Sequence, residues 1–62
     1  SGLGSLLVKE ALKVCKEELK ADKVYIEAQV YAGDFYKKLG FKEISDEFDL
    51  DGIPHIEMIA NL

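Results

Sequence analysis

The sequence has little that could cross-link a small protein. It contains one cysteine and one histidine among its 62 residues, so no disulfide can form within the chain and no His/Cys pairing predicts a zinc site. A chain of this length buries only about 60% of the surface that its unfolded form exposes. Small domains usually gain further stability from disulfides, metals or association. We therefore expect a single, marginally stable domain over residues 1–62.

Blocks of positive charge and long apolar runs are also missing. The net charge is −4, and lysines alternate with acidic residues, unlike the clustered Lys/Arg surfaces that bind nucleic acid or anionic membranes. No apolar run approaches the roughly 20 residues of a membrane span, and the start lacks the basic segment of a signal peptide. The lone Cys15 fits a reducing compartment. These features predict a cytoplasmic protein with no nucleic-acid or membrane partner and no metal.

Periodic segments fill the chain from end to end. Residues 5–20 place apolar side chains at helical spacing, which predicts an amphipathic helix capped by Ser5. The expected apolar face of this helix contains Leu7, Val8, Ala11, Leu12, Val14, Cys15 and Leu19. Residues 24–30 alternate apolar and polar side chains, so they form a strand with one buried face.

The second half of the chain predicts a short helix and two strands. In residues 31–39 the side chains of Ala32, Phe35, Tyr36 and Leu39 recur at i, i+3, i+4 and i+7, which makes both aromatic rings candidates for the core. Gly40 follows as a residue that ends a helix with a positive φ. Strands are expected over residues 41–48 and 55–62, joined by turn chemistry at residues 49–52. The predicted fold class is α/β (α+β) in the order α-β-α-β-β, with a three-stranded sheet and a C-terminal hairpin.

The glycines at the start suit a phosphate. A Gly-x-Gly that opens a helix presents backbone N–H groups and the positive end of the helix dipole to an anion. Glycine also lets a ligand approach the backbone closely. The alternative interpretation is a flexible N-terminal stub before a capped helix.

Two longer motifs carry a family resemblance. Residues 29–41, from Gln29 through Phe35-Tyr36 to Gly40-Phe41, resemble the GNAT superfamily pattern of a strand that ends in a polar amide, followed by Ala, Phe-Tyr and Gly-Phe. Residues 51–58, Asp-Gly-Ile-Pro-His-Ile-Glu-Met, are similar to the Gly-Ile-Pro-His-x-x-Met ending of its ElaA-like branch. The resemblance covers Gly2 to Met58 and implies the C-terminal half of a GNAT domain, with residues 24–30 antiparallel to the last strand.

The resemblance implies acetyl transfer from acetyl-coenzyme A to a primary amine by direct attack, without a covalent enzyme intermediate. Tyr36 then corresponds to the tyrosine that protonates the leaving thiolate. Gln29 either hydrogen-bonds the cofactor arm or ties down the following helix. Cys15 is expected to pack rather than react. The backbone N–H groups expected to receive the pyrophosphate are those of Gly2, Leu3, Gly4 and Ser5.

Two features of the C-terminal half have alternative interpretations. His55, the only histidine, could act as a base for the amine substrate, or it could order the hairpin by bonding to the backbone. The acidic residues of 46–51 could attract a cationic amine, or they could form a solvated turn. We expect the structural interpretation in both cases.

The departures from the family pattern concern the first half of a GNAT domain. The strands and helices that precede the Gly-x-Gly, and the Arg or Gln just upstream of it, have no counterpart in this sequence. We therefore expect a chain that is inactive alone and pairs with a second copy or with the missing N-terminal half. The alternatives are a small non-catalytic, self-associating interaction module, and a cofactor-binding half-domain that self-assembles.

Overall fold

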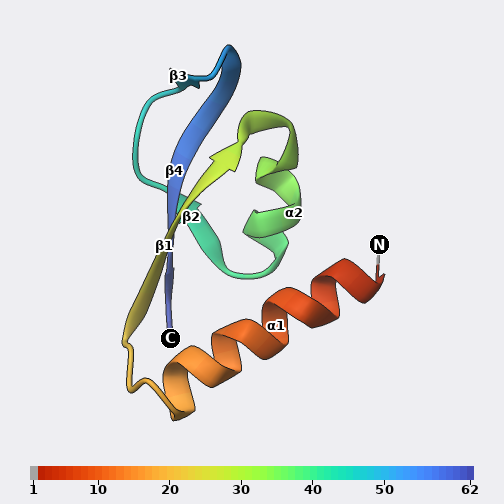
Figure 1. Ribbon diagram of the computed structural model, residues 1–62, viewed down its shortest axis with the longest axis vertical. Helices are drawn as coiled ribbons and strands as arrows, with labels where there is room; N and C mark the ends of the chain where they lie inside the picture. The colour runs from red at the N-terminus through yellow and green to blue at the C-terminus, as the bar shows by residue number, and fades with distance from the viewer. Residues whose placement is uncertain (1) are drawn as a thin grey trace.

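The computed structural model describes residues 2–62 and contains two α-helices against one antiparallel sheet (Figure 1). Ser1, the first residue of the glycine segment, lies outside the described residues. The elements in chain order are α1 (Gly2–Glu17), β1 (Lys23–Gln29), the 3₁₀ turn η1 (Val30–Ala32), α2 (Gly33–Lys38), β2 (Phe41–Glu43), β3 (Phe48–Leu50) and β4 (Ile53–Asn61). The predicted fold class and the predicted C-terminal hairpin are confirmed. Between residues 2 and 62, neither helix has the length and apolar character needed to cross a bilayer.

Strand β4 is the central strand of the sheet. It pairs along one side with β1, antiparallel, as predicted, from Lys23 opposite Asn61 to Gln29 opposite His55. Along its other side it pairs with β2 and then with β3. Strand β1 therefore forms an edge of the four-stranded sheet.

The expected strand over residues 41–48 is divided into β2 and β3, so residues 2–62 form four strands instead of the predicted three. Between them the Ser45 hydroxyl accepts a hydrogen bond from the backbone N–H of Glu57 at 2.9 Å, and the N–H of Ile44 donates to the Glu57 carbonyl at 2.9 Å. A side chain thus replaces a backbone partner of the central strand. Buried backbone groups must be paired. Because the Ser45 hydroxyl accepts the Glu57 N–H, the strand can be interrupted between β2 and β3 without leaving that N–H of β4 unpaired.

The hairpin between β3 and β4 turns at Asp51 and Gly52. Their φ angles are 54° and 78°, as the two central residues of a type I′ turn require. The Gly52 N–H donates to the Asp49 carboxylate at 3.3 Å. The predicted turn is therefore confirmed but shorter, because Asp49 and Leu50 belong to β3.

Both helices pack on one face of the sheet. The core consists of Ala28, Phe41, Ile56, Met58 and Ala60, and the Met58 side chain is completely buried. Helix α1 contributes Val8 and Leu12 to this cluster, and α2 contributes Tyr36 and Leu39. Because strand side chains alternate between faces, the opposite face carries Tyr25, Glu27, Gln29, His55 and Glu57.

Helix α1 corrects two sequence-based expectations. It begins at Gly2 instead of Ser5, so Ser5 is not the cap and the glycines lie in its first turn, since the leucines around them favour helix. It ends at Glu17, and Lys20 then takes a left-handed φ of 58°.

The expected single apolar face of α1 is also wrong. Leu3, Leu6 and Leu7 are 64–69% exposed, whereas Val8 and Leu12 contact the core. Successive helical residues differ by about 100° in direction, so these side chains cannot all face one sheet. The helix therefore has a second, uncovered apolar stripe, which we call the leucine stripe (Leu3, Leu6 and Leu7).

An ion pair connects α2 to β2. The Lys37 ammonium lies 2.9 Å from a Glu43 carboxylate oxygen, and both side chains are about half exposed. The pKa of Lys37 is raised above its usual value of 10.5, mainly by the hydrogen bond to Glu43. The negative charge of Glu43 raises this pKa further, and the charge of Asp34 contributes less. The pair links α2 to β2 at the surface, whereas Tyr36 itself is held by aromatic packing.

We expect Met58→Ala to lower the free energy of unfolding by about 2–5 kcal/mol, because it removes the fully buried side chain at the centre of the core. Met58→Leu, which conserves volume, should cost less than about 1.5 kcal/mol. Leu19→Ala, at a 70% exposed side chain, should change stability by less than about 0.5 kcal/mol. Urea denaturation followed by circular dichroism measures all three. A Met58→Ala effect equal to that of Leu19→Ala would contradict this core.

We expect Glu43→Gln to lower the pKa of Lys37 toward 10.5, and Asp34→Asn to lower it by less. A folded-state pKa raised above the unfolded value stabilises the fold below the unfolded pKa, and this contribution disappears as the pH rises through the folded value. The contribution of the pair should thus be complete below pH 10.5 and lost above it. NMR titration of the lysine side chain measures the shift, and equal effects of the two variants would refute the assignment to Glu43.

Candidate functional site

A hollow of about 330 Å³ lies at the carboxyl end of β1. Its walls come from β1, η1, α2 and β4, and they consist of Glu27, Ala28, Gln29, Tyr31, Ala32, Tyr36 and His55. Two other hollows, of about 230 and 200 Å³, lie against α1 and against the β3–β4 hairpin. The hollow at β1 brings together Gln29, Tyr36 and His55, three of the side chains that the sequence indicated.

Tyr36 is held at this hollow by aromatic packing. Its ring meets the Phe35 ring edge to face, with centroids 5.1 Å apart, and the Phe41 ring likewise at 5.6 Å. The two rings were both expected in the core, but Tyr36 contacts the core cluster and half-buried Phe35 does not. Among residues 2–62 the Tyr36 hydroxyl makes no hydrogen bond. It is therefore a rigidly placed donor with free hydrogen-bonding capacity.

Gln29 ends β1 and immediately precedes η1. Its backbone occupies the cap position of that turn, but its side chain makes no capping hydrogen bond. The interpretation that the amide ties down the following helix therefore has no support in the geometry of residues 2–62. The half-buried amide lines the hollow and makes no side-chain hydrogen bond within the part of the chain that the structure describes.

His55 is 7% exposed, and it lies opposite Gln29 in the β1–β4 register. Its Nδ1 lies 2.8 Å from the Ile53 carbonyl, so Nδ1 carries the hydrogen and donates it. Its ring lies against the Phe48 ring, with centroids 6.1 Å apart. The predicted backbone bond is thus present, and it assigns the lone pair of the neutral ring to Nε2.

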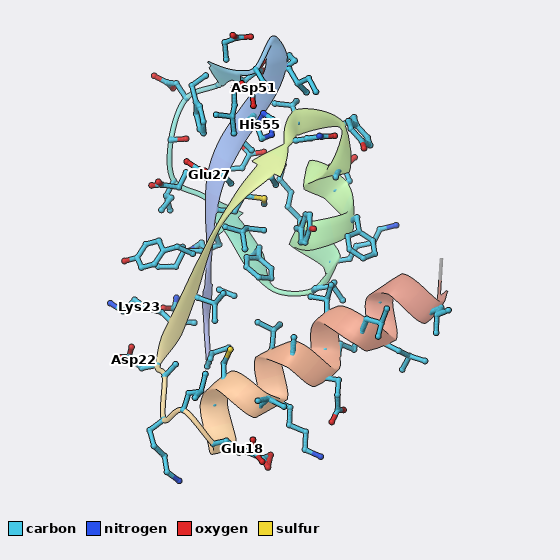
Figure 2. The ribbon with its side chains drawn as sticks, in the orientation of Figure 1. Glu18, Asp22, Lys23, Glu27, Asp51 and His55 are labelled. Atoms are coloured by element: carbon cyan, nitrogen blue, oxygen red, sulfur yellow. The ribbon has the colours of Figure 1, made fainter. Side chains whose placement is uncertain are left out.

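Glu27 is a wall residue that the sequence analysis did not single out. It occupies a polar position of the alternating strand, two residues before Gln29, and its side chain is exposed. Residues i and i+2 share one face of a strand. The spacing of Glu27, two positions before Gln29, could therefore have indicated from the sequence that both side chains lie on the same face. Figure 2 shows Glu27 and His55 toward the same end of the sheet.

The remaining predicted residues lie elsewhere. Gly2, Leu3, Gly4 and Ser5 form the first turn of α1, which Figure 1 places well apart from the β3–β4 end of the sheet. The acidic residues Asp46, Glu47, Asp49 and Asp51 are all exposed and none lines the hollow. Their solvated-turn interpretation fits the Asp49 contact within the hairpin.

Comparison with known proteins places this geometry in a family. The model of the acetyltransferase (GNAT) domain matches residues 1–62. UPF0039 protein C11D3.02c of Schizosaccharomyces pombe is 41% identical over 63 residues, which cover 100% of this chain and 42% of the yeast protein.

Two solved structures have the same fold. An acyl-CoA N-acyltransferase from Pseudomonas aeruginosa superposes with a TM-score of 0.88 at 32% identity, over 97% of this chain and 40% of that one. Escherichia coli ElaA gives a TM-score of 0.88 at 30% identity, over 98% of this chain and 40% of that one. The chain thus spans about 40% of the length of these relatives. It belongs to the GNAT acetyltransferase family and shares its fold with ElaA.

Proposed function

We propose that this chain is the C-terminal part of an N-acetyltransferase domain that transfers the acetyl group of acetyl-coenzyme A to a primary amine. The observation that carries the proposal is the hollow at the end of β1, where Tyr36, Gln29 and His55 meet in a chain of the GNAT family. The substrates and activity of the whole domain are part of this proposal, since the chain spans about 40% of its relatives.

Tyr36 is the proton donor in this proposal. Acetyl-coenzyme A supplies an activated acetyl thioester when it is bound. A free thiol has a pKa of about 8.5 and a tyrosine hydroxyl about 10, so a hydroxyl nearby can stabilise a departing thiolate by hydrogen bonding and then protonate it. The packing of Tyr36 between Phe35 and Phe41 holds the hydroxyl in position before the reaction.

Gln29 and the first turn of α1 hold the cosubstrate. The uncommitted Gln29 amide suits an amide-containing arm, because it offers both donors and an acceptor. The first turn of α1, Gly2 to Ser5, lies at the positive end of a helix of 16 residues and suits a pyrophosphate. Its separation from the hollow agrees with an extended ligand that has phosphates at one end and a thioester at the other.

The open surfaces of the chain indicate where further polypeptide belongs. Strand β1 has an unpaired edge within residues 2–62, and such edges readily accept another strand. The leucine stripe of α1 is 64–69% exposed. We propose that the remainder of the acetyltransferase domain covers both surfaces, and that a second copy of the chain does so when the remainder is absent.

The chain should bind acetyl-coenzyme A with a dissociation constant between micromolar and low millimolar in a calorimetric titration. Tyr36→Phe should keep that constant within about threefold, because it removes only the hydroxyl. In a polypeptide with the complete domain, Tyr36→Phe should reduce kcat about 100-fold or more, and Tyr25→Phe, outside the hollow, should have no effect. Unchanged turnover in Tyr36→Phe would rule out the proton-donor role, and an absence of binding at several millimolar would rule out a half-site in this chain.

The isolated chain should form dimers or larger assemblies in size-exclusion chromatography with light scattering. The triple variant Leu3→Ser, Leu6→Ser and Leu7→Ser should shift the chain toward monomer, because the exposed leucine stripe supplies the apolar contact between copies. Leu19→Ser, which is exposed but outside the stripe, should leave the assembly unchanged. If the wild-type chain is monomeric and unfolds in a two-state thermal transition with a midpoint above roughly 60 °C, then no partner is needed to cover the β1 edge and the leucine stripe.

A further inference from the structure

The turn between β3 and β4 exposes the bond between Asp51 and Gly52. Of the five aspartates in the chain, Asp51 is the one followed by glycine. Both residues of this pair are exposed, and a Cβ added at Gly52 would meet no atom of residues 2–62 within 4 Å apart from its chain neighbours. Figure 2 places Asp51 toward the same end of the sheet as His55. Within the described residues, no distant side chain therefore crowds the Gly52 nitrogen.

The same turn holds the Gly52 N–H against a carboxylate. Asp51 and Gly52 have φ angles of 54° and 78°, and they lie between Leu50 and Ile53, which pair with each other in the ladder. The Gly52 N–H is therefore not part of the ladder, and it donates to the Asp49 carboxylate at 3.3 Å. A carboxylate at about hydrogen-bond distance from a nitrogen can take the proton of that nitrogen as it reacts.

We propose that Asp51 and Gly52 form a covalent modification site, at which Asp51 is converted into isoaspartate through a cyclic imide. In the first step, the Gly52 nitrogen forms a bond to Cγ of the Asp51 side chain, which closes a five-membered ring. The bond from Cγ to one carboxyl oxygen breaks. The Asp49 carboxylate takes the Gly52 proton, and the departing oxygen leaves as water with this proton and one from solvent.

Water then opens the imide ring. If water cleaves the bond between the Gly52 nitrogen and Cγ, aspartate is restored. If it cleaves the bond between that nitrogen and the main-chain carbonyl carbon of Asp51, the product is isoaspartate, in which the chain runs through the side chain and the α-carboxylate is free. The water lost in the first step is regained, so no oxidant or other reactant is needed and the mass is unchanged. The backbone of the turn is then one atom longer.

The added atom changes a turn that sets strand register. A two-residue type I′ turn matches the strands that it joins, and hairpin register is fixed by turn type and loop length. Here the register pairs Leu50 with Ile53 and Phe48 with His55. The Ile53 carbonyl accepts the hydrogen of His55 Nδ1 at 2.8 Å. A longer turn displaces this carbonyl, so a reaction at the surface alters the orientation of a side chain in the wall of the hollow.

Ageing of the purified chain at neutral pH and physiological temperature tests the site. Isoaspartate is counted by the transfer of labelled methyl groups from S-adenosylmethionine with an isoaspartate carboxyl methyltransferase, and it is located by peptide mapping. We expect at least fivefold more isoaspartate at residue 51 than at any other aspartate. Asp51→Gly keeps a residue suited to a positive φ but removes the carboxyl group, so it should lower methyl transfer at least fivefold. Isoaspartate spread evenly over the five aspartates, or unchanged methyl transfer in Asp51→Gly, would overturn the proposal.

Asp49→Asn tests the proton acceptor, because an asparagine oxygen can still accept the Gly52 N–H but is a much weaker base. Conversion at residue 51 should slow at least threefold. Asp46→Asn makes the same charge change at an exposed residue of the same acidic stretch and should stay within 1.5-fold of wild type. In concentrated urea the two variants should react at equal rates, since the contact with Asp49 needs the folded turn. Equal rates in the folded chain would overturn the role of Asp49.

NMR of the aged chain tests the link between the turn and the hollow. The isoaspartate form, separated by chromatography, should lose the ¹⁵N signature of the hydrogen on His55 Nδ1 and show shifted backbone signals over residues 48–55. The Met58 signals should stay in place, because the pairing of β1 with β4 around Met58 does not involve the turn. His55 signals that are identical before and after conversion would overturn the coupling between turn and hollow.

Discussion

The antiparallel pairing of β1 with β4 is the constraint on which the rest of this structure depends. Its register sets Ala28 against Ile56 and Gln29 against His55, and it therefore decides at once which side chains enter the core and which line the hollow. A slip of one residue would exchange the two faces. The buried Met58, opposite Ile26, makes that slip costly, because its side chain would leave the core for water.

Strand β1 is an edge strand within residues 2–62, and the hollow lies at its carboxyl end. The unpaired edge of this strand and the exposed leucine stripe are both features that favour association.

Local sequence patterns predicted most of the elements but not their exact partners. The alternation of residues 24–30 and the Asp51-Gly52 turn are governed by neighbouring residues, so both were predictable. The division of the third strand depends on the Ser45 hydroxyl reaching Glu57, twelve residues away, which no local pattern contains. Likewise, helical spacing made Phe35 and Tyr36 equivalent, and only the sheet beneath α2 distinguishes the ring on the core from the ring outside it.

The sequence by itself determined the order of the elements, the family and the residue types of the candidate site, because periodicity, turn chemistry and motifs are local properties of the chain. It also supplied Tyr36, Gln29 and His55 as separate candidates. The tertiary structure decided that these three meet with Glu27 at one hollow, that the first turn of α1 lies apart from it, and that Nε2 of His55 is the available nitrogen. Those results depend on strand register and on hydrogen bonds across the sheet, which arise only when distant segments pack together.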